Sequence, residues 1–129
     1  LSIRRQRQMC IRDSFTLNAF HNLGVGSQKA TPDEGRFAVT KDPADWGTFK
    51  TPTLREIAKT APYMHDGSLA TLEEVVEYYD KGGVKNKNLD ERLKPLQLTA
   101  AEKKDLVEFM KSLNGEGWQH LTEPKSFPQ

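Results

Sequence analysis

The sequence is short of apolar residues and has almost no cysteine. Only 36% of its 129 residues are hydrophobic, and the mean hydropathy is -0.72. A single domain of this length can bury a core, so either that core is small or a cofactor or neighbouring domain supplies apolar surface. The sequence contains no run of about 18 apolar residues, which excludes a transmembrane helix. The only cysteine, Cys10, excludes an internal disulfide framework.

The first fourteen residues differ in composition from the rest. They hold four arginines against Asp13, a net charge of +3, whereas the whole chain carries +1. They lack helical or strand periodicity and the apolar stretch of a secretory signal. Their end, Met-Cys-Ile-Arg-Asp-Ser, is typical of translated sequencing-adapter read-through. We therefore expect residues 1–14 to be an artefact, with a disordered basic arm as the alternative.

Helical periodicity appears in three places after Phe15. Helices are expected over residues 52–59, 72–81 and 100–113. Thr71 with Glu74, and Thr99 with Glu102, have the spacing of capping boxes. Residues 29–52 are rich in proline, glycine and aspartate and predict a long ordered loop, fixed by Phe37, Val39, Trp46 and Phe49. Because no strand pattern occurs, the predicted class is all-α with long loops.

Residues 61–83 place three potential metal ligands close together. Met64 and His65 lie in a loop, and the next helix ends in Tyr78 and Tyr79. A thioether, an imidazole and a phenol can each bind a metal, but on spacing alone each is more often ordinary packing. Adjacent helical residues are about 100° apart, so only one tyrosine can face fully inward.

Three ordered stretches carry a family resemblance: FHNLGVG, then the run from DEGRFAVTKDP to YYDKGG, then LTAAEKKDLVEFMKSLNG. Over residues 15–115 the chain is similar to the C-terminal haem domain of bacterial di-haem cytochrome c peroxidases and MauG-type enzymes. The resemblance implies a cytochrome c-like domain of a periplasmic protein with two haem c groups and a calcium ion. It also implies an oxidoreductase that reduces hydrogen peroxide or uses it to oxidise a partner, with this domain serving electron transfer. A small redox protein or a protein substrate would be the electron donor.

The resemblance also implies roles for individual residues. Tyr79 matches the position of the axial haem ligand, and its phenolate would favour ferric and higher oxidation states. Met64 is the alternative axial ligand. Arg55 and His65 match residues at the haem edge, where they would meet the propionates. Calcium would bind backbone carbonyls, a hard-cation ligand type, and the residues matched for this role are Thr60 and Pro62.

The sequence departs from the family at the haem attachment site. The family places Cys-x-x-Cys-His just before Phe15, where this chain has Met-Cys-Ile-Arg-Asp-Ser. Cys10 is therefore not half of the attachment motif. We expect a truncated gene product that lacks the N-terminal haem domain, binds haem weakly or not at all, and has no peroxidase activity alone. The segment 116–129 is expected to be a tail.

Two other functions remain open at this stage. The first is a mono-haem c electron-transfer domain, which requires a Cys-x-x-Cys-His motif upstream and no second haem domain. The second is a haem-free interaction domain that uses the basic residues of 1–14 to bind an anionic partner.

Overall fold

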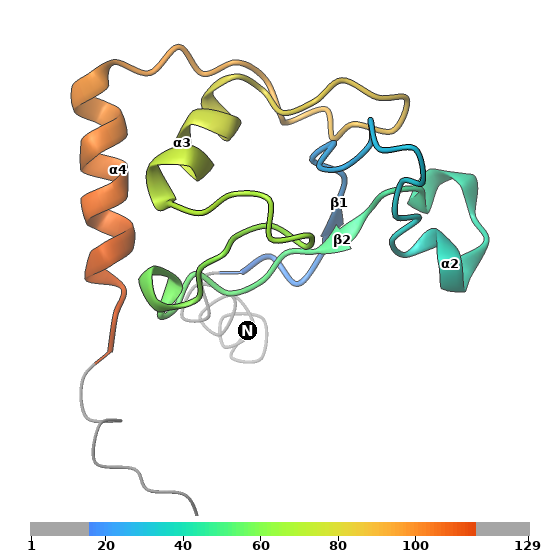
Figure 1. The fold of residues 1–129 in the computed structure, drawn as a ribbon, viewed down its shortest axis with the longest axis horizontal. Helices are drawn as coiled ribbons and strands as arrows, with labels where there is room; N and C mark the ends of the chain where they lie inside the picture. Colours follow the sequence, from blue (N-terminus) through green and yellow to red (C-terminus); the bar gives the residue numbers. More distant parts are fainter. Residues whose placement is uncertain (1–15, 116–129) are drawn as a thin grey trace, which may run out of the picture.

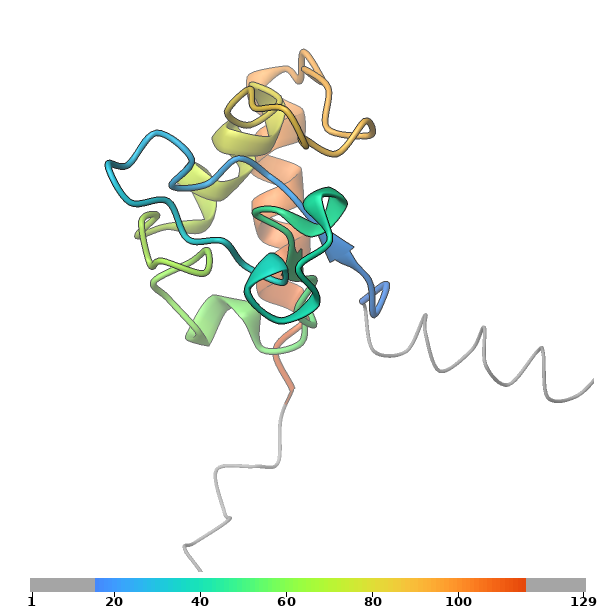
Figure 2. The same ribbon diagram turned by 90° about the vertical axis from the view of Figure 1, so that its right-hand side faces the viewer.

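The computed structural model describes residues 16–115, so the predictions made for residues 1–14 and 116–129 lie outside the described residues. In chain order the elements are β1 (Phe20–His21), α2 (Phe37–Thr40), the 3-10 helix η1 (Pro43–Asp45), β2 (Phe49–Lys50), the 3-10 helix η2 (Ile57–Lys59), α3 (Leu72–Asp80) and α4 (Ala100–Ser112). Helices α3 and α4 lie side by side at one end, and α2 lies at the other (Figure 1). The turned view shows α4 running behind α3 (Figure 2).

The two longer helices confirm the sequence prediction, because their start signals are local. At α3 the Thr71 hydroxyl accepts from the Glu74 amide, and the Glu74 carboxylate accepts from the Thr71 amide. At α4, Thr99 and Glu102 form the same reciprocal pair. Each capping box satisfies amides that the first helical turn leaves without a partner.

The all-α prediction is wrong, because the described residues contain a small sheet. Strand β1 pairs antiparallel with β2, with Phe20 opposite Lys50 and His21 opposite Phe49. Each strand is only two residues long, too short for the alternation of apolar and polar side chains that marks a strand in sequence. Most of the chain between the elements is loop.

The helix predicted over residues 52–59 is also largely absent. Only Ile57–Lys59 is helical, as a 3-10 turn, because Glu56 has a left-handed backbone with a φ of 58°. Contacts with the end of α4 hold it there: the Glu56 amide donates to the Leu113 carbonyl at 3.3 Å, and the Gly115 amide donates to the Glu56 carboxylate. A tertiary contact thus overrides the helical periodicity.

The loop predicted over residues 29–52 contains α2, η1 and β2. Trp46 packs against Phe37 with 5.0 Å between ring centroids, as expected of a residue that fixes the loop. Val39 was expected to do the same, but it is 86% exposed at the tip of α2. The loop is therefore held by its aromatic residues and not by Val39.

The hydrophobic core of residues 16–115 is small, which is one of the two alternatives that the composition allows. The buried apolar side chains are Leu72 and Val76 of α3 and Val107 of α4. Partly buried residues pack around them, namely Ile57, Ala58, Tyr63, Leu98 and Met110. Within residues 16–115 no helix is long and apolar enough to cross a membrane.

Charged contacts support the small core at the junction of α3 and α4. Lys103 of α4 lies 2.6 Å from the carboxylates of both Glu77 and Asp80 in α3. The Asp80 carboxylate also accepts from the Leu98 amide at 2.9 Å, which fixes the turn into α4. Lys103 is the main cause that lowers the pKa of Asp80 below its ordinary value.

Candidate functional site

The C-terminal end of α3 carries two tyrosines with different environments. The Tyr78 hydroxyl donates to the Leu23 carbonyl at 2.9 Å, and its side chain is half-buried. Tyr79 is 37% exposed, and within residues 16–115 its hydroxyl has no hydrogen-bond partner. The two rings meet edge to face, with 6.5 Å between their centroids. Burial of the phenol raises the pKa of Tyr79, so the hydroxyl is protonated at neutral pH unless a cation binds it.

The loop that carries Met64 and His65 is closed at its base. The amides of Tyr63 and Leu69 each donate to the other's carbonyl, at 2.7 and 3.4 Å. At the tip, Met64 is half-buried with a φ of 71°, and the exposed His65 ring stacks on Phe49 of β2 at 3.7 Å. The loop thus holds the His65 ring against β2.

An ion pair ties the same loop to the segment after β1. Lys29 lies 2.7 Å from the Asp66 carboxylate, which is largely buried, and its hydrogen bond lowers the pKa of Asp66 to about 2. The pKa of Tyr78 is raised chiefly by burial, and the charge of Asp66 contributes to the same shift. The Asp66 carboxylate of this loop is therefore within electrostatic reach of the Tyr78 hydroxyl.

The remaining predicted residues lie around η2. Arg55 is exposed in the turn before it, and Thr60 and Pro62 follow it. Within residues 16–115, no hydrogen bond to the carbonyl of Thr60 or Pro62 is found. The same residues contain no cluster of three His, Cys, Asp or Glu side chains able to hold a metal ion. A cation here would depend on backbone oxygens.

The donor atoms of this region fit one side of a haem iron. Tyr79 offers an oxygen that no other described group occupies, and a phenolate oxygen is a known axial donor to haem iron. The Met64 sulfur is the second candidate from the neighbouring loop. The proximal side has no equivalent, because the sequence contains no Cys-x-x-Cys-His motif.

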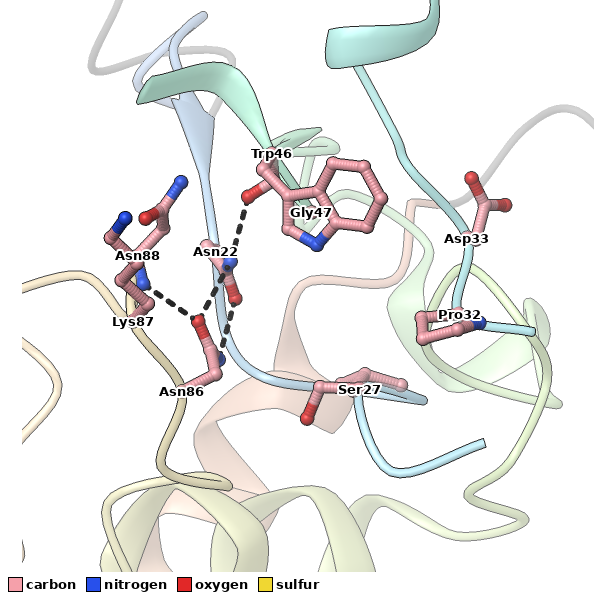
Figure 3. A pocket seen from close by; sticks show the side chains of 10 residues that line it. Asn22, Ser27, Pro32, Asp33, Trp46, Gly47, Asn86, Lys87 and Asn88 are labelled. Atoms are coloured by element: carbon pink, nitrogen blue, oxygen red, sulfur yellow. Dashed lines mark hydrogen bonds between the residues drawn. The ribbon is translucent and has the colours of Figure 1, made fainter. Parts of the chain in front are cut away.

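Sequence reasoning missed Asn22, a buried residue that joins three loops. Its amide nitrogen donates to the Trp46 carbonyl at 2.9 Å and to Asn86 (Figure 3). Its oxygen accepts from the Gly24 amide at 2.8 Å. No sequence signal identifies it, because its partners lie up to 64 residues away.

The cavity beside Asn22 has a volume of about 130 Å³ and is lined by asparagines together with Lys87, Asp33 and Trp46 (Figure 3). This is below the roughly 300 Å³ of ordinary ligand pockets. None of the predicted site residues lines it. We assign this region to joining the loops that carry Asn22, Trp46 and Asn86.

Comparison with known proteins relates the chain to a group of oxidoreductases. No family profile matches it. It is 51% identical over 85 residues to cytochrome-c peroxidase IdrP1 of Pseudomonas sp. (strain SCT), covering 66% of the chain and 22% of that protein. It is 42% identical over 104 residues to the methylamine utilization protein MauG of Methylorubrum extorquens, covering 79% of the chain and 29% of that protein.

A solved structure is similar in fold as well as in sequence. The crystal structure of a MauG-like protein associated with microbial copper homeostasis matches with a TM-score of 0.69 and 43% identity, over 76% of this chain and 33% of that one. The chain thus spans between about a fifth and a third of the length of these relatives.

Proposed function

The chain belongs to the family of di-haem cytochrome c peroxidases and MauG proteins, and from this premise we propose that residues 15–115 form the C-terminal haem domain of such an oxidoreductase. Haem c is the cofactor of this family. When bound here it would supply one-electron redox chemistry. The domain's part is to carry electrons for an enzyme that reduces hydrogen peroxide or uses it to oxidise a partner.

The observation that carries the proposal is the environment of Tyr79. Its hydroxyl has no hydrogen-bond partner within residues 16–115, and it adjoins Tyr78, whose hydroxyl lies within electrostatic reach of Asp66 in the loop that carries Met64 and His65. The Tyr79 hydroxyl is partly exposed and is not engaged by another described group, so its oxygen would be available to a ferric iron. Tyr79 is therefore the proposed iron ligand, and Met64 is the alternative.

The other assignments follow from the same proposal. Arg55 and His65 would face the haem propionates, and the carbonyls of Thr60 and Pro62 would bind calcium at the boundary with the N-terminal haem domain. The intact protein would act in the periplasm, with a small redox protein or a protein substrate as electron donor. Residues 1–14 would have no role, and the chain alone would bind haem weakly and lack peroxidase activity.

The test requires a chain in which the attachment motif is present. In a chimera, residues 1–14 are replaced by the corresponding haem-attachment segment of the Methylorubrum extorquens MauG relative. The chimera is exported to the periplasm of a host with c-type haem maturation. The ferric absorption spectrum and electron paramagnetic resonance are then compared for the parent chimera, Tyr79→Phe and the matched variant Met64→Leu.

We expect the parent to show the charge-transfer band of a tyrosinate bound to ferric iron. Tyr79→Phe should lose this band, because phenylalanine has no donor oxygen. Met64→Leu should leave the spectrum nearly unchanged, because leucine removes only a sulfur that is not bound. The opposite pattern, with the spectrum changed by Met64→Leu and unchanged by Tyr79→Phe, would assign the ligand to Met64. If neither substitution changes the spectrum, both Tyr79 and Met64 are refuted as iron ligands.

A further inference from the structure

The Tyr78 hydroxyl is bound to a fixed point of the backbone. It donates to the Leu23 carbonyl at 2.9 Å, across 55 residues of sequence. The same carbonyl accepts from the Val84 amide at 3.4 Å, just beyond the end of α3. One backbone oxygen thus holds both the last turn of the helix and the chain that leaves it.

Two glycines keep this oxygen in place. Gly24 has a φ of 81°, and a Cβ atom there would overlap the Val84 carbonyl. Gly83 has a φ of 66°, and a Cβ atom there would lie 2.5 Å from the Leu23 carbonyl oxygen. The backbone beside Leu23 and the backbone after α3 therefore run closer together than side chains allow. The acceptor of the Tyr78 hydroxyl belongs to this rigid joint.

Tyr79 has no such anchor of its own. Its hydroxyl is without a partner among the described residues, and its ring meets the Tyr78 ring edge to face. Neighbouring positions on a helix are about 100° apart, so fixing Tyr78 to one side of α3 sets the direction in which Tyr79 leaves the helix. The Tyr78 ring then limits the space in which the Tyr79 ring can turn.

We propose that Tyr78 is the positioning residue of the site: its bond to the Leu23 carbonyl fixes the rotation of the α3 end and thereby holds the Tyr79 oxygen in one orientation for the iron. This inference rests on the proposed function, since it assigns Tyr78 a role toward the ligand named there. Tyr78 itself donates no atom to the metal. Its hydroxyl acts through Tyr79.

The experiment uses the full haem-free chain with isotope-labelled tyrosine. Scalar couplings across the Cα–Cβ bond report the side-chain rotamers of Tyr79 in the wild type and in Tyr78→Phe. The matched control is Tyr63→Phe, because the Tyr63 hydroxyl also donates to a backbone carbonyl, that of Ile57 at 3.0 Å, and this acceptor belongs to η2 and not to the Leu23–Val84 joint at the C-terminal end of α3. Amide dispersion and helical circular dichroism verify that each variant is folded.

We expect one dominant rotamer of Tyr79 in the wild type and in Tyr63→Phe. Loss of a hydroxyl hydrogen bond of about 1 kcal/mol should raise the minor-rotamer population about five-fold in Tyr78→Phe. An unchanged rotamer distribution in Tyr78→Phe would overturn the inference, as would equal loosening in Tyr63→Phe. If Tyr78→Phe does not fold, the scalar couplings of Tyr79 in the wild type are the test. Couplings averaged over several rotamers would overturn the inference, and couplings of a single rotamer would support it.

This test separates the inference from the proposed function. Its measurement needs no haem, so a failure to see loosening in Tyr78→Phe leaves the ligand role of Tyr79 intact. Conversely, a chimera spectrum that is unchanged by Tyr79→Phe refutes the ligand role whatever the rotamer distribution.

Discussion

Replacing Gly24 by alanine is expected to remove most of the folded population of the chain. The residue has a left-handed φ of 81°, and an added Cβ would overlap the Val84 carbonyl. The left-handed backbone costs alanine about 1–2 kcal/mol, and the overlap with a backbone atom requires the 22–24 segment to move away from α3. That movement also breaks the hydrogen bond from Tyr78 to the Leu23 carbonyl and the one from the Gly24 amide to Asn22. We therefore expect the free energy of unfolding to fall by about 3 kcal/mol or more. Helical circular dichroism and urea unfolding measure it.

Gly26→Ala is the matched control for this prediction. Gly26 has a similar φ of 69°, but the nearest atom to an added Cβ lies at 3.5 Å, which is ordinary van der Waals contact. The free energy of unfolding of this variant should fall only by the cost of placing alanine in a left-handed backbone, about 1–2 kcal/mol. Equal losses for the two variants would mean that the close approach of the two backbones does not hold the fold together.

Leu72→Ala is expected to have the second large effect. Leu72 is 5% exposed and begins α3, and it is one of the three buried apolar side chains found within residues 16–115. Truncating a buried leucine to alanine costs about 2–5 kcal/mol, through lost apolar burial and the cavity that remains. Few other buried side chains are available to compensate. We therefore expect a strong loss of helical signal and a much lower urea midpoint.

Leu17→Ala serves as the control for the core, because Leu17 is 57% exposed. Its removal should change the free energy of unfolding by no more than about 0.5 kcal/mol. A Leu72→Ala variant as stable as Leu17→Ala would show that the α3–α4 contact does not form the centre of the domain.

The parts of the fold that follow from local chemistry could be predicted from sequence. The two capping boxes at Thr71 and Thr99 lie within four residues of their partners, and both helices formed where expected. The sheet and the break at Glu56 could not be predicted in this way. The sheet pairs residues about 30 positions apart, and Glu56 is held by Gly115, 59 positions away.

The candidate site also has residues that could be predicted from the sequence and residues that could not. Met64, His65 and Tyr79 could be proposed because the family resemblance assigns them roles. In the structure Met64 and His65 share one closed loop, and Tyr79 lies in the last turn of α3. The role of Tyr78 was not visible, since its partner Leu23 lies 55 positions away. The Lys29–Asp66 pair likewise depends on a separation of 37 residues. Long-range contacts of this kind carry no periodicity that a single sequence displays.

The most direct test of the central claim is the haem content of the chimera that restores the attachment segment before Phe15. Mass spectrometry of the purified chain, with its absorption spectrum, gives the number of covalently bound haems. If residues 15–115 form a haem domain, we expect one haem per chain and a six-coordinate ferric spectrum. A chimera that is folded, exported and matured alongside a haem-loaded control cytochrome, yet contains no haem, would contradict the account.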